Sequence, residues 1–327
     1  MDPGFRRGDV RNMITLSNGH SFEFVAASGA LAFDGRGWPW EWPLRWVGLL
    51  KPGLFTIVTK SLTLEPRRGN LRWFAPFRCV RQLRGGAVNA VGLTNPGIDW
   101  WIKKVYPAVE KSGWNFVVSI AGESLQDYME MTIRLKNLRA GSGTTGRDTT
   151  GCDSVIKAIE INASCPNSPG ELQQNTQAVI DTAQALKYIS PFPLILKLSC
   201  THEYLKIAKA LEGTVEAISI NSVPWAQIFP DKKSPLARFG GGGVSGKMAQ
   251  PQNWKMAAEL AQNTKIPVIG ASVWNYNDLT DLFGFGAKAI AFGSIFLSAP
   301  WRPTLFVQRW RREADQRAAD QKNRQPA

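Results

Sequence analysis

The stretch Ala158-Ile-Glu-Ile-Asn162-Ala-Ser-Cys-Pro-Asn167-Ser-Pro-Gly170 joins a short apolar run to a tight polar turn. The run, Ala158–Ile161, has the length and composition of a buried strand. Similar runs recur along the chain at spacings of about 25–40 residues, the length of one βα unit. They are Phe55–Thr59, Ala87–Val91, Phe116–Ile120, Leu194–Leu198, Ala217–Ile220, Pro267–Ile269 and Ala289–Phe292. The spacing predicts a repeated βα architecture.

Amphipathic helical patterns lie between most of these runs. Val179, Ile180, Ala183 and Leu186 recur at helical spacing, and Asn277 precedes a similar pattern as a candidate N-cap. Continuous apolar strands, each followed by an amphipathic helix, indicate a buried parallel sheet. The eight runs therefore predict a single-domain α/β fold, the closed (β/α)8 TIM barrel.

The predicted barrel occupies most of the chain. We assign 21–310 to the barrel, 1–20 to a disordered or irregular leader, and 311–327 to a charged C-terminal tail. The Gly- and Thr-rich segment 139–152 is interpreted as a surface insertion, because such composition is typical of loops.

Polar residues stand where most of the predicted strands end. In a barrel the carboxyl ends of all strands meet on one face, where active sites form. Three asparagines and two lysines on that face are difficult to explain by packing alone, so we expect a site for a polar ligand there. In chain order the strand-end residues are Lys60, Asn89, Ser119, Asn162, Lys197, Asn221, Gly270 and Gly293.

The composition is that of a folded protein. Hydrophobic residues make up 44% and charged residues 20% of the 327 residues. No run of about 18 apolar residues is present, which argues against a membrane span. Met1–Asn12 has no apolar stretch behind its arginines, so it is not a secretory signal. We expect a cytoplasmic protein with reduced thiols.

Cysteine and histidine are too scarce and too scattered for a metal centre. The 4 cysteines include no CxxC pair, and there are only 2 histidines, so we expect no bound metal. The net charge of +13 attracts anions. We interpret it as a solvated surface and expect neither nucleic acid nor a membrane as a partner.

Cys165 lies in the polar turn that follows the fourth predicted strand, between Asn162 and Asn167 and beside Pro166. A structural cysteine prefers an apolar, enclosed place. This position therefore favours a proton-transfer or nucleophilic role.

The motif Asn-x-Ser-Cys-Pro-Asn at 162–167 resembles the active-site loop of class 1 dihydroorotate dehydrogenases. The resemblance extends from Phe24 to Phe296, with further family-like motifs in the family's order. These are Val25-Ala-Ala-Ser-Gly29, Val58-Thr-Lys60-Ser61, Pro66-Arg-Arg-Gly69-Asn70, Asn89-Ala-Val-Gly92-Leu93-Thr-Asn95-Pro-Gly97, Lys197-Leu-Ser199, Ile220-Asn221-Ser222 and Gly242-Gly-Val-Ser-Gly246.

The resemblance implies an FMN enzyme that oxidises dihydroorotate to orotate in de novo pyrimidine (UMP) biosynthesis. Cys165 would be the base that removes the C5 proton, while the C6 hydride passes to N5 of FMN. The implied substrate-binding residues are Asn89, Gly92, Leu93, Asn162, Asn167, Asn221 and Ser222. The implied cofactor-binding residues are Ala27, Ser28, Gly29, Lys60, Ser61, Asn162, Lys197, Ile220, Gly246, Gly270, Gly293 and Ser294.

Elementary chemistry agrees with these roles. Asparagine offers a donor and an acceptor on one side chain, which suits a planar pyrimidine with carbonyl and N–H groups. A lysine near a flavin stabilises the negative charge of its reduced form. A thiol with an ordinary pKa of about 8.5 becomes a useful base when lysines are near.

One stretch departs from the family pattern. After the seventh predicted strand the chain has Ser272-Val273 where the family usually has two glycines. Valine adopts a positive φ only with difficulty. The sequence therefore predicts either weaker flavin binding or a different loop path.

Several alternatives stay open. The electron acceptor is either fumarate, in a homodimer, or NAD, through an iron–sulfur flavoprotein subunit, and we expect a homodimer in either arrangement. The quinone-linked class is disfavoured because it would carry serine at the position of Cys165. The competing functions are a tRNA dihydrouridine synthase-like or dihydropyrimidine dehydrogenase-like flavin barrel, and a non-catalytic barrel subunit.

Overall fold

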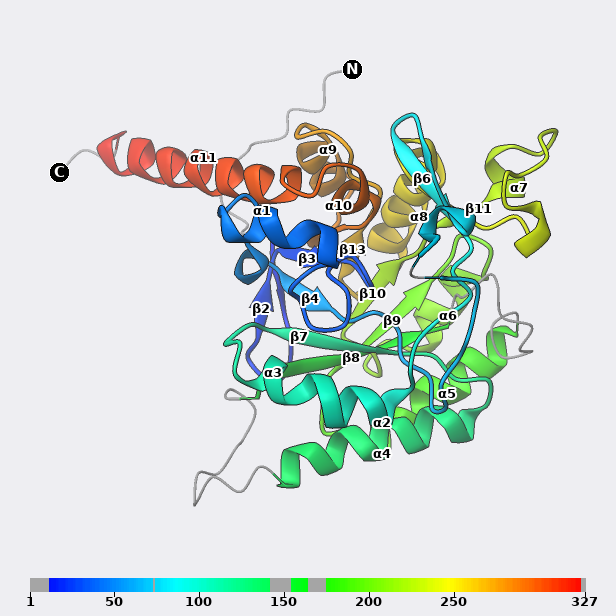
Figure 1. The fold of residues 1–327 in the computed structure, drawn as a ribbon. Coiled ribbons are helices and arrows are strands. Elements are labelled where there is room, and N and C mark those ends of the chain that lie inside the picture. Colours follow the sequence, from blue (N-terminus) through cyan, green and yellow to red (C-terminus); the bar gives the residue numbers. More distant parts are fainter. Residues whose placement is uncertain (1–11, 73, 142–153, 164–174, 325–327) are drawn as a thin grey trace.

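The structure, a computed structural model, describes residues 12–72, 74–141, 154–163 and 175–324. Within this part of the chain, eight strands close into a parallel barrel in the order β3, β4, β7, β8, β9, β10, β13, β14 (Figure 1). Their bounds are Phe24–Ala26, Thr56–Val58, Phe116–Ile120, Ile156–Asn162, Leu194–Leu198, Ala217–Ile220, Val268–Gly270 and Ala289–Phe292. The predicted (β/α)8 barrel is confirmed.

Helices surround the barrel (Figure 1). The longer ones are α4 (Leu125–Gly141), α5 (Thr176–Ile189), α6 (Tyr204–Ala210), α8 (Gln250–Asn263), α9 (Asp278–Gly284) and α11 (Arg302–Arg324). The short ones are α1 (Trp42–Trp46), α2 (Ile98–Trp100), α3 (Tyr106–Glu110), α7 (Trp225–Ile228) and α10 (Ser294–Ser298), with a π-helical turn at Trp101–Val105. Single 3-10 turns occupy Pro39–Glu41, Pro52–Leu54, Pro76–Arg78, Ala237–Phe239 and Lys247–Ala249.

One predicted barrel strand was wrong. The run Ala87–Val91 contributes to β6 (Gly86–Asn89), which belongs to a separate antiparallel sheet with β5 (Val80–Leu83), β12 (Gly243–Gly246) and β11 (Val223–Pro224). The first barrel strand is instead Phe24–Ala26. The runs look alike because an apolar strand in a small covered sheet has the same composition as a barrel strand.

Side chains alternate between the two faces of each barrel strand. In β8, Ile159 and Ile161 pack outward against the helices, whereas Ala158 belongs to the apolar cluster inside the barrel. That inner cluster also contains Ile14 and Leu16, which belong to the hairpin of β1 (Ile14–Thr15) and β2 (Ser21–Phe22). The ordered unit thus begins before the expected boundary at residue 21.

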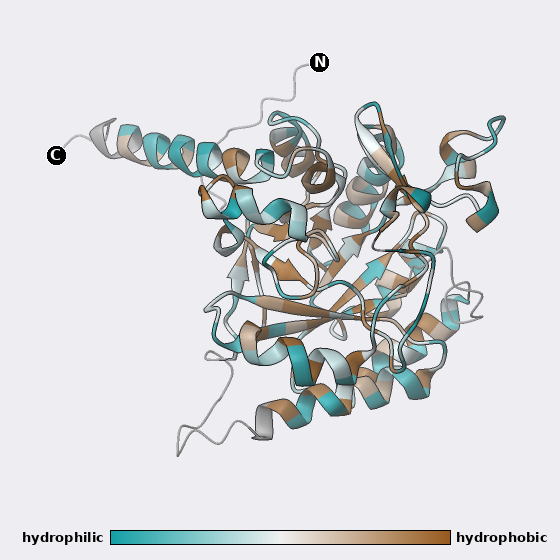
Figure 2. Cartoon of the chain, viewed as in Figure 1, coloured by the Kyte–Doolittle hydropathy of each residue, from teal (hydrophilic) through white to brown (hydrophobic). Residues whose placement is uncertain are grey.

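The C-terminal helix α11 runs through the expected boundary at residue 311. Its first half is anchored because Trp310 packs against Phe24 and Phe283 and donates a 2.7 Å hydrogen bond to Glu23. Figure 2 shows that the rest of α11 is mostly hydrophilic, while the barrel strands are hydrophobic. The N-terminal half of α11 is therefore the part that packs on the barrel.

Candidate active site

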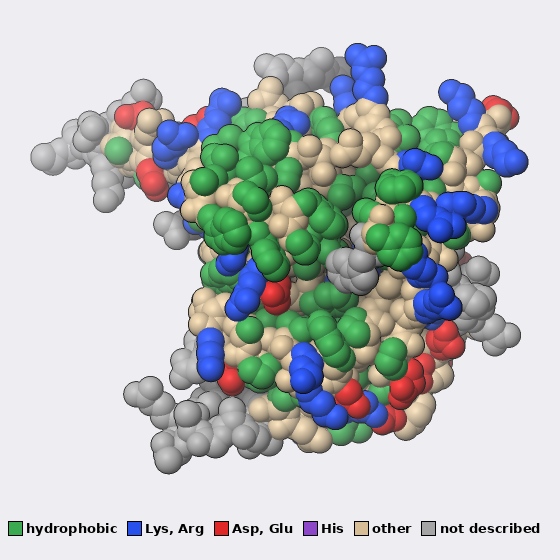
Figure 3. Space-filling model, in the orientation of Figure 1, with side chains coloured by type: hydrophobic (Ala, Val, Ile, Leu, Met, Phe, Trp, Pro, Cys, Tyr) green, Lys and Arg blue, Asp and Glu red, His purple; other side chains and the backbone are tan. Residues whose placement is uncertain are grey.

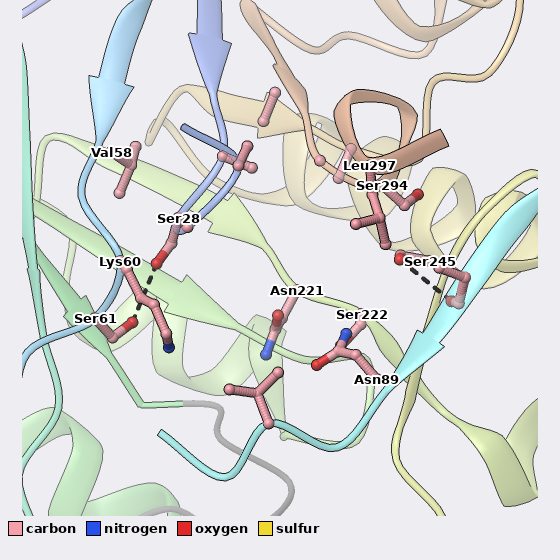
Figure 4. Close-up of a pocket in the computed structure, with 18 of the residues that line it drawn as sticks. Ser28, Val58, Lys60, Ser61, Asn89, Asn221, Ser222, Ser245, Ser294 and Leu297 are labelled. Atoms are coloured by element: carbon pink, nitrogen blue, oxygen red, sulfur yellow. Dashed lines mark hydrogen bonds between the residues drawn. The ribbon is translucent and has the colours of Figure 1, made fainter. Parts of the chain in front are cut away.

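A cavity of about 890 Å³ opens among the carboxyl ends of the barrel strands. Cavities of this size hold cofactors and small substrates. In Figure 4 the side chains of Lys60, Asn89, Asn221 and Ser222 surround one open space. The predicted site residues that line it are Ala27, Ser28, Gly29, Lys60, Ser61, Asn89, Gly92, Leu93, Asn162, Lys197, Ile220, Asn221, Ser222, Gly246, Gly293 and Ser294.

The three other predicted site residues are Cys165, Asn167 and Gly270. Cys165 and Asn167 lie outside the described residues. Gly270 is described but is not among the lining residues, although its neighbours Ile269 and Ala271 are. A Cβ atom at this position would come within 2.6 Å of Leu282 on α9, so its small size is required where β13 packs against this helix. Its contact with the cofactor stays a prediction.

Asn89 reaches the cavity by a route that the sequence did not indicate. It ends β6, which pairs antiparallel with β12 so that Asn89 faces Gly243 across the ladder. Gly246, at the other end of β12, lines the cavity as well. A Cβ atom on Gly246 would come within 2.5 Å of the Gly85 carbonyl oxygen, so the glycine is also required for this strand pairing.

Glu160 is a buried carboxylate that lines the cavity, with 3% of its surface exposed. It accepts hydrogen bonds from the hydroxyls of Ser119, at 2.8 Å, and Ser219, at 2.9 Å. The Lys197 ammonium lies 3.7 Å from it. A buried charge requires such partners. Sequence analysis missed Glu160, although its place two residues before Asn162 puts both side chains on the same strand face.

A chain of hydrogen bonds links Asn162 to Glu160. The Asn162 amide nitrogen donates to Ser61 Oγ at 2.9 Å, and Ser61 and Ser119 hydroxyls lie 2.9 Å apart. An ionised carboxylate only accepts, so Ser119 donates to Glu160 and Ser61 donates to Ser119. The buried charge thereby orients the amide of Asn162 toward the barrel wall.

The predicted substrate loop is held from below by Asn95, which is 5% exposed. Its amide nitrogen donates to the Leu93 carbonyl at 2.7 Å, and its amide oxygen accepts from the backbone N–H groups of Thr63 and Gly97. These bonds stabilise Leu93 at φ 55°, a conformation that non-glycine residues seldom adopt. Strain of this kind is typical of binding loops.

Ser272 occupies the position where the family pattern has a glycine, and it adopts φ 71°. Two side chains of α8 hold it there. Asn253 donates to Ser272 Oγ at 2.9 Å, and Gln250 donates to the Ser272 carbonyl at 3.0 Å. Val273 does not have a positive φ and is buried in the core. Only the first of the two positions adopts the left-handed backbone, and there the bonds from α8 stabilise a residue other than glycine.

Asn253 supplies a test of whether the cavity fits a ligand. Its side chain is 1% exposed and lines the cavity, and its nitrogen donates to Ser272 and to the Asn221 carbonyl. Its oxygen has no hydrogen-bond partner among the described residues. A buried acceptor without a donor costs about 1–3 kcal/mol. This oxygen is enclosed in the cavity wall. The cavity itself presents two ammonium groups, on Lys60 and Lys197, which suit the negative charge of a reduced flavin, so the residues present fit the group.

The described residues contain no group of three or more His, Cys, Asp or Glu side chains able to hold a metal ion. No helix in the described ranges has the length and apolar content needed to cross a bilayer.

A barrel whose carboxyl-end cavity combines asparagine amides, two lysines and a buried carboxylate is built like an enzyme that holds a cofactor beside a small polar substrate. The family model described as dihydroorotate dehydrogenase matches residues 45–302, and the chain belongs to this family. The family is flavin-dependent in general. The resemblance seen in the sequence is thus confirmed at the level of the family.

Related proteins cover most of the chain. One from Bacteroides thetaiotaomicron, described as dihydroorotate dehydrogenase B (NAD(+)), catalytic subunit, is 29% identical over 245 residues, which are 73% of this chain and 74% of that protein. A protein from Alkaliphilus metalliredigens with the same description is 30% identical over 261 residues, 78% of this chain and 79% of its own length.

A solved structure has the same fold. The ligand-free type DHODH from Eimeria tenella superposes with a TM-score of 0.65 at 17% identity, covering 94% of this chain and 88% of that one. At this identity the likeness concerns the fold alone.

Proposed function

We propose that this chain is a class 1 dihydroorotate dehydrogenase that oxidises dihydroorotate to orotate with FMN in de novo pyrimidine biosynthesis. The observation that carries the proposal is the convergence of Asn89, Asn162 and Asn221 with Lys60 and Lys197 on one cavity. The descriptions of the relatives, at 29–30% identity, support the class.

The substrate is a planar, anionic pyrimidine. Asn89, Asn221 and Ser222 present amide and hydroxyl groups to the cavity from different elements (Figure 4). Because amides donate and accept, they can bind both the carbonyl and the N–H edge of the ring. The backbone of the loop at Gly92 and Leu93 closes the same side of the site.

The flavin would lie against the residues of β3, β4 and β9. Lys60 and Lys197 would face it with positive charge, and Ser28, Gly29 and Ala27 would contact it through the loop after β3. Bound there, FMN would accept the hydride from C6 of dihydroorotate. Gly293 and Ser294, at the start of α10, would meet its phosphate end.

Cys165 would take the proton from C5 of the substrate. It follows Asn162 by three residues in the sequence, and Asn167 follows two residues later. Thiolate character at neutral pH is favoured by nearby ammonium groups, and the cavity contains two, on Lys60 and Lys197. This role remains a prediction from the motif.

We further propose that the protein acts in the cytoplasm, that two copies associate, and that electrons leave through a separate iron–sulfur flavoprotein subunit to NAD. The relatives described as catalytic subunits of an NAD-linked enzyme support the last point. Fumarate is the alternative acceptor. Oxidation of the dihydroorotate-reduced protein by fumarate alone would contradict the two-subunit arrangement.

The first experiment is the visible spectrum of the purified protein before and after anaerobic addition of dihydroorotate. We expect a flavin band that bleaches. A flavin band that bleaches with a reduced nicotinamide and reoxidises with uracil or tRNA, but not with orotate, would contradict the substrate assignment. A colourless protein that cannot be reconstituted with FMN would favour a non-catalytic barrel.

A further inference from the structure

An exposed apolar surface, which we call the tryptophan patch, lies beside the mouth of the cavity. Figure 3 shows hydrophobic side chains gathered over the region of α1 and α10, with lysine and arginine atoms around them. The patch combines exposed side chains of 36–51 and 297–312. They are Trp40, Trp42, Trp46, Val47, Leu49, Leu297, Trp301 and Leu305.

The two segments form one surface. The Lys51 backbone N–H donates to the Thr304 hydroxyl at 3.1 Å, which ties the end of the first segment to α11. Trp40 and Leu297, one from each segment, line the same cavity. The patch is therefore continuous with the rim of the proposed active site.

Several side chains of the patch protrude. Trp46 is 71% exposed and Val47 is 69% exposed, and both lie at the end of α1. Large apolar side chains gathered on the surface of a folded protein usually mark an interaction site.

The charge on the two segments has a single sign at the surface. They carry seven cationic residues, which are Arg36, Arg45, Lys51, Arg302, Arg309, Arg311 and Arg312. Two of them, Arg36 and Arg309, form ion pairs with Asp34 and Glu313, which lie just outside the segments. The segments' only acidic residue, Glu41, is 1% exposed. The partner of this surface must accordingly be apolar in part and negatively charged.

We propose that the tryptophan patch binds the surface of an anionic lipid bilayer, peripherally and without spanning it. Tryptophan is the side chain that prefers the boundary between lipid headgroups and acyl chains. Arginine and lysine around an apolar face add attraction to anionic headgroups. Bound in this way, the cavity mouth would lie next to the bilayer. This proposal replaces the expectation from the sequence that no membrane is a partner.

The first segment offers few polar side chains to a partner. Residues 36–51 contain no Ser, Thr, Asn, Gln or Asp. The boundary of a bilayer needs no matched hydrogen-bonding side chains, only apolar groups with tryptophan at headgroup depth and cations beside them. A second copy of this chain is disfavoured, because a two-fold interface would bring the same cations face to face.

The test is flotation of the intact flavin-loaded protein with vesicles, and it requires no turnover. One set contains equal parts of phosphatidylglycerol and phosphatidylcholine, and the other contains phosphatidylcholine alone. We expect binding to the anionic vesicles that weakens with salt. The double variant Trp46→Ser, Val47→Ser should bind the anionic vesicles at least about tenfold more weakly. Neither residue lines the cavity, so dihydroorotate should still bleach the flavin.

The matched control is Ile133→Ser with Tyr188→Ser, which removes exposed apolar side chains from α4 and α5, away from the patch. It should float like the unaltered protein. A second variant, Lys51→Gln with Arg312→Gln, alters charge only and should lose binding to anionic vesicles about as strongly. Equal binding to both vesicle types, an equal loss of binding in the control variant, or no flotation with anionic vesicles at low salt would each overturn the proposal.

Discussion

The carboxylate of Glu160 lies 3.7 Å from the ammonium of Lys197, with both groups on the wall of the same cavity. The carboxylate is the more enclosed partner and is held by two serine hydroxyls. Lys197 therefore presents its charge to the cavity with a counter-charge directly behind it.

Removing the carboxylate of Glu160 should raise the midpoint potential of the bound flavin. In Glu160→Gln the positive charge of Lys197 is no longer balanced, so the anionic reduced flavin is stabilised. We expect the midpoint potential of the bound flavin to rise by about 30 mV or more, which corresponds to about 1.4 kcal/mol for two electrons. The measurement is an anaerobic titration against a redox dye. Ser219→Ala keeps the charge pair and serves as control, and an equal shift in that variant would contradict the electrostatic explanation.

Cys165→Ala should retain the flavin and lose its reduction by dihydroorotate. A positioned base contributes about 10²- to 10⁴-fold, so the rate of bleaching should fall within that range. Stopped-flow absorbance measures it. Cys200→Ala, at a half-buried cysteine that does not line the cavity, is the matched control and should bleach at the normal rate. Unchanged bleaching in the Cys165 variant would remove this residue from the chemistry.

Glycine should be tolerated at position 272 and not at 273. In Ser272→Gly the relief of the left-handed backbone offsets the lost hydrogen bond from Asn253, so we expect a change in unfolding free energy within about 1 kcal/mol. Val273→Gly removes a buried side chain and should cost about 2 kcal/mol or more. Urea unfolding compares the two. Similar losses of unfolding free energy in both variants would contradict the view that position 272, unlike position 273, has a backbone conformation that favours glycine.

His20 should make stability depend on pH at the bottom of the barrel. Burial first, and the charge of Lys157 second, lower its pKa from 6.5 to about 4. The folded protein thus binds this proton less readily than the unfolded chain does, so stability falls as the pH drops from 6.5 to 4. Relative to His20→Gln, the unaltered protein should lose about 1–2 kcal/mol across this window, because solvent screens part of the effect at a side chain that is only partly buried. Parallel stability curves for the two proteins would disprove the assignment.

Much of the fold was predictable because it depends on local pattern. The apolar runs at Phe116–Ile120 and Leu194–Leu198 coincide with β7 and β9. The N-cap position Asn277 was predicted as well, although Asp278 and not Asn277 accepts the hydrogen bonds from Trp274 and Asn275. The first barrel strand, Phe24–Ala26, was not recognised, because three residues are too few to show a period.

The site was predictable only where a residue type is unusual for its place. Asn162 and Lys197 stand out at strand ends, and both line the cavity. Asn253 gave no signal, because an asparagine on an amphipathic helix is ordinary until the helix is placed against a cavity. Gly270 gave an ambiguous one, since a glycine required for packing looks the same in sequence as one required by a ligand.

By itself the sequence determined the barrel class, the family-like motifs and the set of amides and lysines, because strand and helix periodicities and strand-end positions are properties of the chain. Tertiary structure alone decided three further features. These are the delivery of Asn89 from a side sheet, the pairing of Glu160 with Lys197, and the exposure of Trp46 and its neighbours. Each depends on burial or contact between segments that are far apart in the sequence. Such contacts form only when the chain folds.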